Sequence, residues 1–126
     1  MKHSSVALVE DNFDSAEMLL LMLEASGIQD VHWFSCGKDF LDAEASSFDV
    51  VLLDISLPDM DGYGVLRQLR ETNTTLPVIA VTANASGHDV EKGRLAGFTD
   101  YVTKPILDVD GFCALVKSYI TEHLAA

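Results

Sequence analysis

Fully apolar runs, each followed by polar residues, recur along the chain. The apolar runs are Val6–Val9, Val50–Leu53 and Val78–Val81, and the less uniformly apolar segments Val31–Phe34 and Tyr101–Thr103 look like shorter strands. A strand with one exposed face alternates apolar and polar residues, whereas a strand buried on both faces is apolar throughout. The runs therefore predict five short strands of a buried parallel sheet.

Apolar residues at helical spacing fill the stretches between these runs. We expect helices over Ser15–Ala25, Lys38–Ala45, Gly64–Glu71 and Asp89–Ala96. The buried face of a last helix would comprise Phe112, Leu115, Val116, Tyr119, Ile120 and Leu124. Five strand–helix pairs in alternation predict the α/β class, with an open parallel sheet that carries helices on both faces.

Residues at three of the predicted helix ends support this assignment. Gly27 and Gly97 follow two of the helices, where glycine is the preferred C-terminal cap. Asp61 precedes a third helix and is expected to be its N-cap.

The composition is typical of a single globular domain, and the net charge argues against some classes of binding partner. The 126 residues, of 13.7 kDa, suffice for one hydrophobic core. The 20 acidic and 8 basic residues give a formal net charge of -12, which argues against binding to nucleic acid or to anionic membranes. The 2 cysteines, Cys36 and Cys113, are no disulfide framework, and no apolar stretch is long enough to span a bilayer. We therefore expect a cytoplasmic location.

Residues with reactive or ligand-binding side chains follow the predicted strands. Glu10 and Asp11 follow the first strand, Asp54 the third, Thr82 the fourth and Lys104 the fifth. Parallel strands present their carboxyl ends at one edge, where open α/β sheets bind ligands, so we expect these side chains to meet. Three carboxylates repel one another unless a cation lies between them, and Mg²⁺ prefers such oxygen ligands. An aspartate in this setting can accept a phosphoryl group whose oxygens the hydroxyl and the ammonium bind.

Each of these residues has a plainer interpretation when taken alone. Asp11 or Asn12 would cap the following helix, and Asp54 would only end a strand. Complementary polar groups at four strand ends are harder to explain as separate caps, which favours a functional site.

Four motifs in order resemble those of response-regulator receiver domains of two-component and phosphorelay signalling. They are Val6–Asn12 (VALVEDN), Asp54–Gly62 (DISLPDMDG), Ile79–Ala83 (IAVTA) and Gly97–Pro105 (GFTDYVTKP). Together they extend over essentially the whole chain. The resemblance implies a doubly wound, flavodoxin-like (βα)5 domain with strand order 2-1-3-4-5.

The resemblance also implies a phosphoryl acceptor and a metal site. Asp54 would accept the phosphoryl group from a phosphohistidine on a histidine kinase or a histidine phosphotransfer protein. Asp11, Asp54 and the backbone carbonyl of Ser56 would bind Mg²⁺, with Mn²⁺ as an alternative ion, and Glu10 would bind it through water. Lys104 would pair with the phosphoryl group.

A switch follows from the same resemblance. Thr82 would turn toward the phosphoryl group, and Tyr101 would turn inward behind it. The resulting change would reach a protein output partner through a surface within residues 90–124. Ser56 and Asn84 would tune dephosphorylation, and the Lys104–Pro105 bond would be cis.

The first predicted helix contains six consecutive apolar residues, Met18 to Leu23. Residues in a row on a helix point to all of its sides, so these six cannot all face the sheet. We expect Leu21 or Met18 to be exposed and to dock a helical, histidine-bearing partner. Trp33 and Phe34 are expected to pack under helices.

Other functions fit the sequence less well. A signalling-silent interaction module would have no need of Asp54, Thr82 and Lys104 together. A magnesium-dependent phosphatase with an aspartyl nucleophile would carry a second acid where Ser56 stands, and a flavin protein would have a Ser/Thr-rich loop after the first strand. We expect no enzyme activity on an external substrate, only self-phosphorylation and slow autodephosphorylation.

The expected organisation is one receiver domain over residues 1–126 with no output domain. This domain would be a stand-alone regulator or the receiver of a hybrid histidine kinase. A monomer is expected, and phosphorylation could drive dimerisation.

Overall fold

A five-stranded parallel sheet forms the centre of the molecule in the computed structural model, which describes residues 5–83 and 87–125. Its strands are β1 (Val6–Val9), β2 (Val31–Phe34), β3 (Val50–Leu53), β4 (Val78–Thr82) and β5 (Asp100–Thr103). They lie in the order β2-β1-β3-β4-β5, and every pair is parallel. The predicted class, strand order and strand positions are confirmed.

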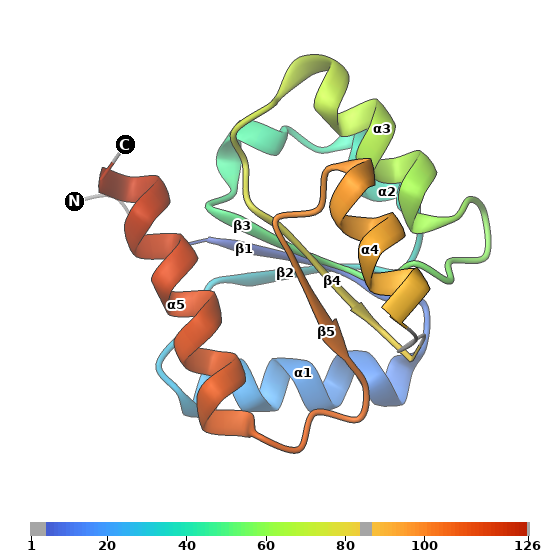
Figure 1. The fold of residues 1–126 in the computed structure, drawn as a ribbon. Coiled ribbons are helices and arrows are strands. Elements are labelled where there is room, and N and C mark those ends of the chain that lie inside the picture. Colours follow the sequence, from blue (N-terminus) through green and yellow to red (C-terminus); the bar gives the residue numbers. More distant parts are fainter. Residues whose placement is uncertain (1–4, 84–86, 126) are drawn as a thin grey trace.

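Helices cover both faces of this sheet (Figure 1). They are α1 (Phe13–Ala25), α2 (Gly37–Asp42), α3 (Gly62–Thr72), α4 (Gly87–Ala96) and α5 (Val109–Ala125), with a 3-10 turn, η1, at Ala45–Ser47. One core cluster joins the sheet to α1 and α5, and a second joins it to α2 and α3. Because β1, β3 and residues 78–81 of β4 contribute alternate residues to the two clusters, these segments must be apolar on both faces.

Polar caps explain why two helices begin where they do. The Asn12 side chain accepts the backbone N–H of Ser15 at 2.9 Å, and α1 begins two residues earlier than expected. The predicted Asp61 cap of α3 is confirmed, since its Oδ1 accepts the N–H of Gly64 at 2.8 Å. Gly27 and Gly97 have positive φ angles of 98° and 112°, in keeping with their predicted place after α1 and α4.

The helix expected over Lys38–Ala45 is shorter than predicted. It ends at Asp42 because the backbone of Ala43 is extended, and η1 follows. Phe40 and Phe48 lie on either side of this turn and belong to the same core cluster. The chain therefore turns early so that both rings reach one core.

The predicted face of α5 is largely confirmed. Phe112, Val116 and Ile120 are buried, and Leu115 and Tyr119 are half-buried, while the side chain of Leu124 lies outside the described residues.

Trp33 departs from its expected place. Phe34 packs in the core beside α2, as predicted, but Trp33 lies at the edge strand β2 with 38% of its surface exposed. Its ring meets Phe13 at the start of α1 edge to face, with 5.9 Å between the ring centroids. Across the described ranges, no helix combines the length and the apolarity needed to cross a bilayer.

Candidate functional site

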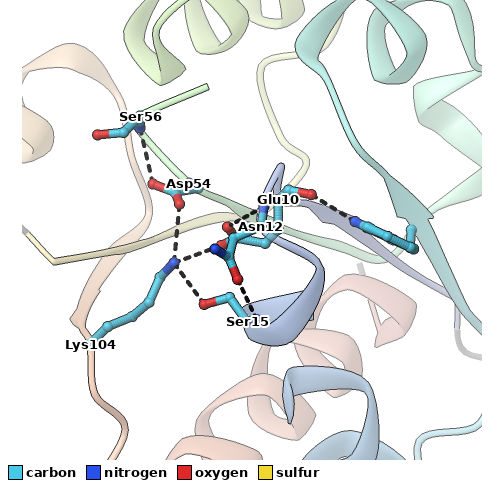
Figure 2. Close-up of polar contacts among 7 residues, drawn as sticks. Glu10, Asn12, Ser15, Asp54, Ser56 and Lys104 are labelled. Carbon is cyan, nitrogen blue, oxygen red and sulfur yellow. Dashed lines mark hydrogen bonds and ion pairs between the residues drawn. The ribbon is translucent and has the colours of Figure 1, made fainter. Parts of the chain in front are cut away.

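The carboxyl ends of β1, β3 and β5 bring three charged side chains into contact (Figure 2). The Lys104 ammonium lies 2.7 Å from Oε2 of Glu10 and 3.0 Å from Oδ2 of Asp54. It also lies 3.3 Å from the hydroxyl of Ser15, in the first turn of α1. Lys104 follows β5 directly, and its bond to Pro105 is cis, as expected.

The two carboxylates of this site are shielded from water. Glu10 is 1% exposed and Asp54 is 7% exposed. Burial raises the pKa of Glu10, the hydrogen bond from Lys104 opposes that rise, and the charge of Asp54 adds to it. Burial would lower the pKa of Lys104, but its hydrogen bonds to Glu10 and Asp54 together with the negative charges of these two residues outweigh burial, and the pKa is raised. The lysine therefore stays charged beside two acids.

Glu10, Asp11 and Asp54 together form an oxygen-rich group at this edge. One carboxylate oxygen from each residue lies within 4.8 Å of the others. Asp11 is exposed, so the group opens to solvent on one side. Hard oxygen donors with access to water are what Mg²⁺ requires, and the residues present fit that ion.

Backbone contacts hold the carboxylate of Asp54 in place. The N–H of Ser56 donates to Oδ1 of Asp54 at 3.0 Å (Figure 2). The two ends of the loop that follows Asp54 lie side by side, because the N–H of Gly62 donates to the carbonyl of Ile55 at 2.6 Å. A Cβ at Gly62 would lie 2.6 Å from Cα of Ile55 and 2.9 Å from the carbonyl oxygen of Asp54. Only glycine fits at position 62 without moving residues 55–61, which we call the acceptor loop because they follow Asp54, the expected phosphoryl acceptor.

Two further predicted site residues lie nearby on β4 and β5. Thr82 is the last residue of β4, is 1% exposed, and pairs with Thr103. Tyr101 pairs with Ala80 and is half-buried. Asn84, the remaining predicted tuning residue, lies outside the described residues.

The predicted docking residues on α1 are both exposed. Met18 is 59% and Leu21 is 60% exposed, which confirms the expected exposure. Met18 lines an apolar groove of about 390 Å³ together with Lys104, Pro105 and Ile106. The groove thus runs from the charged site along α1.

Three contacts at the site were not anticipated from the sequence. Ser15 contacts Lys104, and its position one turn into α1 was the only available signal. The indole N–H of Trp33 donates to the backbone carbonyl of Glu10 at 2.7 Å. Asp59 accepts the N–H groups of Gly37 and Lys38 at 3.0 and 2.9 Å, which ties the acceptor loop to α2.

Comparison with known proteins bears directly on this arrangement. The family model of the response regulator receiver domain matches residues 6–117. The chain is 36% identical over 124 residues to the uncharacterized transcriptional regulatory protein YkoG of Bacillus subtilis, covering 98% of this chain and 54% of that protein. It is 36% identical over 101 residues to the cell cycle response regulator CtrA of Brucella ovis, covering 79% of this chain and 43% of that protein. The chain thus spans about half the length, or less, of these relatives.

Solved structures have the same fold. The BeF3-activated receiver domain of DrrB, a Thermotoga maritima protein, aligns with a TM-score of 0.84 and 36% identity, over 94% of this chain and 98% of that one. The receiver domain of a Francisella response regulator aligns with a TM-score of 0.84 and 27% identity, over 95% and 98% of the two chains. With a family model that matches nearly its whole length and a charged site at the expected sheet edge, the chain belongs to the response-regulator receiver domains of two-component signalling.

Proposed function

We propose that this protein is a phosphorylation-activated switch in which Asp54 accepts a phosphoryl group from a phosphohistidine. The donor is a histidine kinase or a histidine phosphotransfer protein. The observation that carries the proposal is the position of the Lys104 ammonium, 3.0 Å from the Asp54 carboxylate at the edge where Glu10 and Asp11 also lie.

The transfer requires little covalent chemistry from the protein. A carboxylate oxygen of Asp54 forms a bond to phosphorus, and the phosphorus–nitrogen bond breaks. The electron pair of that bond stays on the imidazole nitrogen of the donor, which then takes a proton from water. Positioning and charge neutralisation dominate the barrier of such a transfer.

The residues of the site divide these tasks. Lys104 neutralises the charge gathered on the phosphoryl oxygens, and the N–H of Ser56 holds the Asp54 carboxylate. Glu10, Asp11, Asp54 and the Ser56 carbonyl would hold Mg²⁺, which supplies further charge neutralisation when bound. Ser56 and Asn84 would tune the loss of the phosphoryl group, and Met18 and Leu21 would contact the donor.

The output follows from the place of Thr82 and Tyr101. Both lie on strands at the α4 side of the sheet, and a phosphoryl group on Asp54 offers new acceptor oxygens to the Thr82 hydroxyl. A shift of Thr82 would change the space available to Tyr101. The surface formed by α4, β5 and α5 would then present a different face to a protein partner.

The test is the intact mass after incubation with a small phosphodonor and Mg²⁺. We expect a labile adduct of one phosphoryl group that disappears in Asp54→Asn and on chelation of the metal. Asp39→Asn removes an exposed carboxylate of α2 and serves as the matched control, which should keep the adduct.

Other outcomes would identify the other functions. An intact fold that binds Mg²⁺ but forms no adduct would overturn the proposal in favour of a silent interaction module. Steady turnover of small phosphoesters would overturn it in favour of an aspartyl phosphatase.

A further inference from the structure

The indole of Trp33 holds the backbone of the acidic turn. Its N–H donates to the carbonyl oxygen of Glu10 at 2.7 Å, short for a bond of this type. On the other side of the same residue, the N–H of Glu10 donates to the carbonyl of Phe34 at 3.0 Å. The edge strand β2 therefore binds both backbone polar groups of Glu10, one through its main chain and one through a side chain.

The hydrogen bond from Trp33 affects the orientation of Asp11 through the peptide bond between Glu10 and Asp11. The Glu10 carbonyl belongs to the planar peptide that leads into Asp11, so a bond to its oxygen sets the plane from which the Asp11 side chain departs. Asp11 is exposed, yet one of its carboxylate oxygens lies within 4.8 Å of those of Glu10 and Asp54.

The ring of Trp33 also contacts the far side of this turn. Phe13, the first residue of α1, packs against the indole at an angle of 61° between the ring planes. Trp33 thus touches the chain immediately before and shortly after Asp11, and so limits the movement of the turn Glu10–Asn12.

We infer that Trp33 is a positioning residue for the metal site, one that orients Asp11 through the Glu10 peptide. The inference rests on the proposed function, because it concerns the same Mg²⁺ site. Loss of a hydrogen bond to a ligand side chain typically weakens metal binding about 10–100-fold. Trp33 acts one peptide further away, so we expect its loss to raise the Kd for Mg²⁺ about 3–10-fold.

Thermodynamic linkage between Mg²⁺ binding and the Trp33 hydrogen bond provides a second measurement, the tryptophan emission. If the indole bond favours metal binding, metal binding must favour the indole bond by the same factor. Trp33 is the single tryptophan of the chain, so any change of tryptophan emission on adding Mg²⁺ arises at this residue and reports on the surroundings of its indole.

The test uses Mg²⁺ itself as the probe and amide NMR shifts of the turn as the readout. Trp33→Phe keeps an aromatic ring beside Phe13 while it removes the N–H donor and one ring of the indole, so comparison with Phe13→Leu, which changes the aromatic contact and keeps the donor, separates the hydrogen bond from packing. His32→Gln changes an exposed neighbour on β2 and is the matched control. Thermal unfolding of each variant without metal checks that the fold is kept, and Phe13→Leu tests the aromatic contact if Trp33→Phe proves unstable.

The outcomes separate this inference from the proposed function. We expect native affinity in His32→Gln, weaker binding in Trp33→Phe, and a saturable change of native tryptophan emission that Asp11→Asn abolishes. Native affinity in a folded Trp33→Phe would overturn the positioning role and leave the phosphoryl acceptor intact. Absence of Mg²⁺ binding by the native protein would overturn both.

Discussion

The ammonium of Lys104 lies 3.0 Å from the Asp54 carboxylate and 2.7 Å from that of Glu10, although 50 and 94 positions of sequence separate the partners. One lysine therefore compensates two buried acids at once. A buried carboxylate without a partner is costly, so the lysine stabilises the fold in addition to its role in the proposed phosphoryl transfer.

Replacement of this lysine should destabilise the protein most when Mg²⁺ is absent. We expect Lys104→Ala to lower the free energy of unfolding by about 1–2 kcal/mol, because Glu10 and Asp54 would face each other uncompensated. Added Mg²⁺ should restore part of the loss, since a ligand of the native state stabilises it. Denaturant unfolding with and without Mg²⁺ measures both effects. Lys117→Ala, on the exposed side of α5, is the control, and equal stability of the two variants would contradict the prediction.

Two glycines of α3 should respond in opposite ways to alanine. A Cβ at Gly62 would lie 2.6 Å from the backbone of Ile55, whereas a Cβ at Gly64 has Asp61 Oδ1 as its nearest neighbour at 3.6 Å. We expect Gly62→Ala to cost about 1–3 kcal/mol of stability and Gly64→Ala to be neutral or stabilising by about 0.5 kcal/mol. Thermal unfolding measures the stability of both variants. Similar unfolding temperatures for Gly62→Ala and Gly64→Ala would contradict the prediction and show that the acceptor loop tolerates the extra carbon.

Gly93 of α4 and Tyr101 of β5 should be energetically coupled. A Cβ at Gly93 would lie 2.9 and 3.0 Å from two carbons of the Tyr101 ring. Gly93→Ala alone should therefore fail to gain the ~1 kcal/mol that alanine normally adds to a helix interior. In a Tyr101→Ala background the same change should gain it, which a double-mutant cycle of unfolding free energies would measure. Additive effects would mean that the ring moves aside freely, and Gly93 would then place no limit on the proposed motion of Tyr101.

Asp59 should titrate at unusually low pH. The N–H groups of Gly37 and Lys38 donate to its carboxylate and lower its pKa. Because the pKa is lower in the folded state than in the unfolded state, this stabilisation is present above the unfolded pKa and is lost as pH falls through the folded one. NMR titration of the side-chain carboxyl carbon measures the pKa. Asp59→Asn should lessen the fall of stability in acid, and an ordinary pKa for Asp59 would contradict the proposed tie to α2.

Strand and helix positions were predictable because they depend on local pattern. Val6–Val9, Val50–Leu53 and the run that begins at Val78 are apolar throughout and so can be stable only inside a layered sheet. Asp61 and Gly97 likewise act within a few residues of themselves, as an N-cap and as a residue of positive φ after a helix. The short α2 was mispredicted because the burial of Phe40 and Phe48 in one core outweighed the helical pattern between them.

The meeting of Glu10, Asp54 and Lys104 was also predictable, since parallel strands place their carboxyl ends at one edge whatever the loops do. Their partners were not. Ser15 beside Lys104, Trp33 on the Glu10 carbonyl and Asp59 on the start of α2 are contacts between distant segments. Ser15 and Asp59 are of types common on a solvated surface, and Trp33 was expected to pack under a helix, so the sequence pattern did not indicate any of the three contacts. Such contacts depend on the distances between packed elements, and those distances exist only once the sheet and its helices have come together.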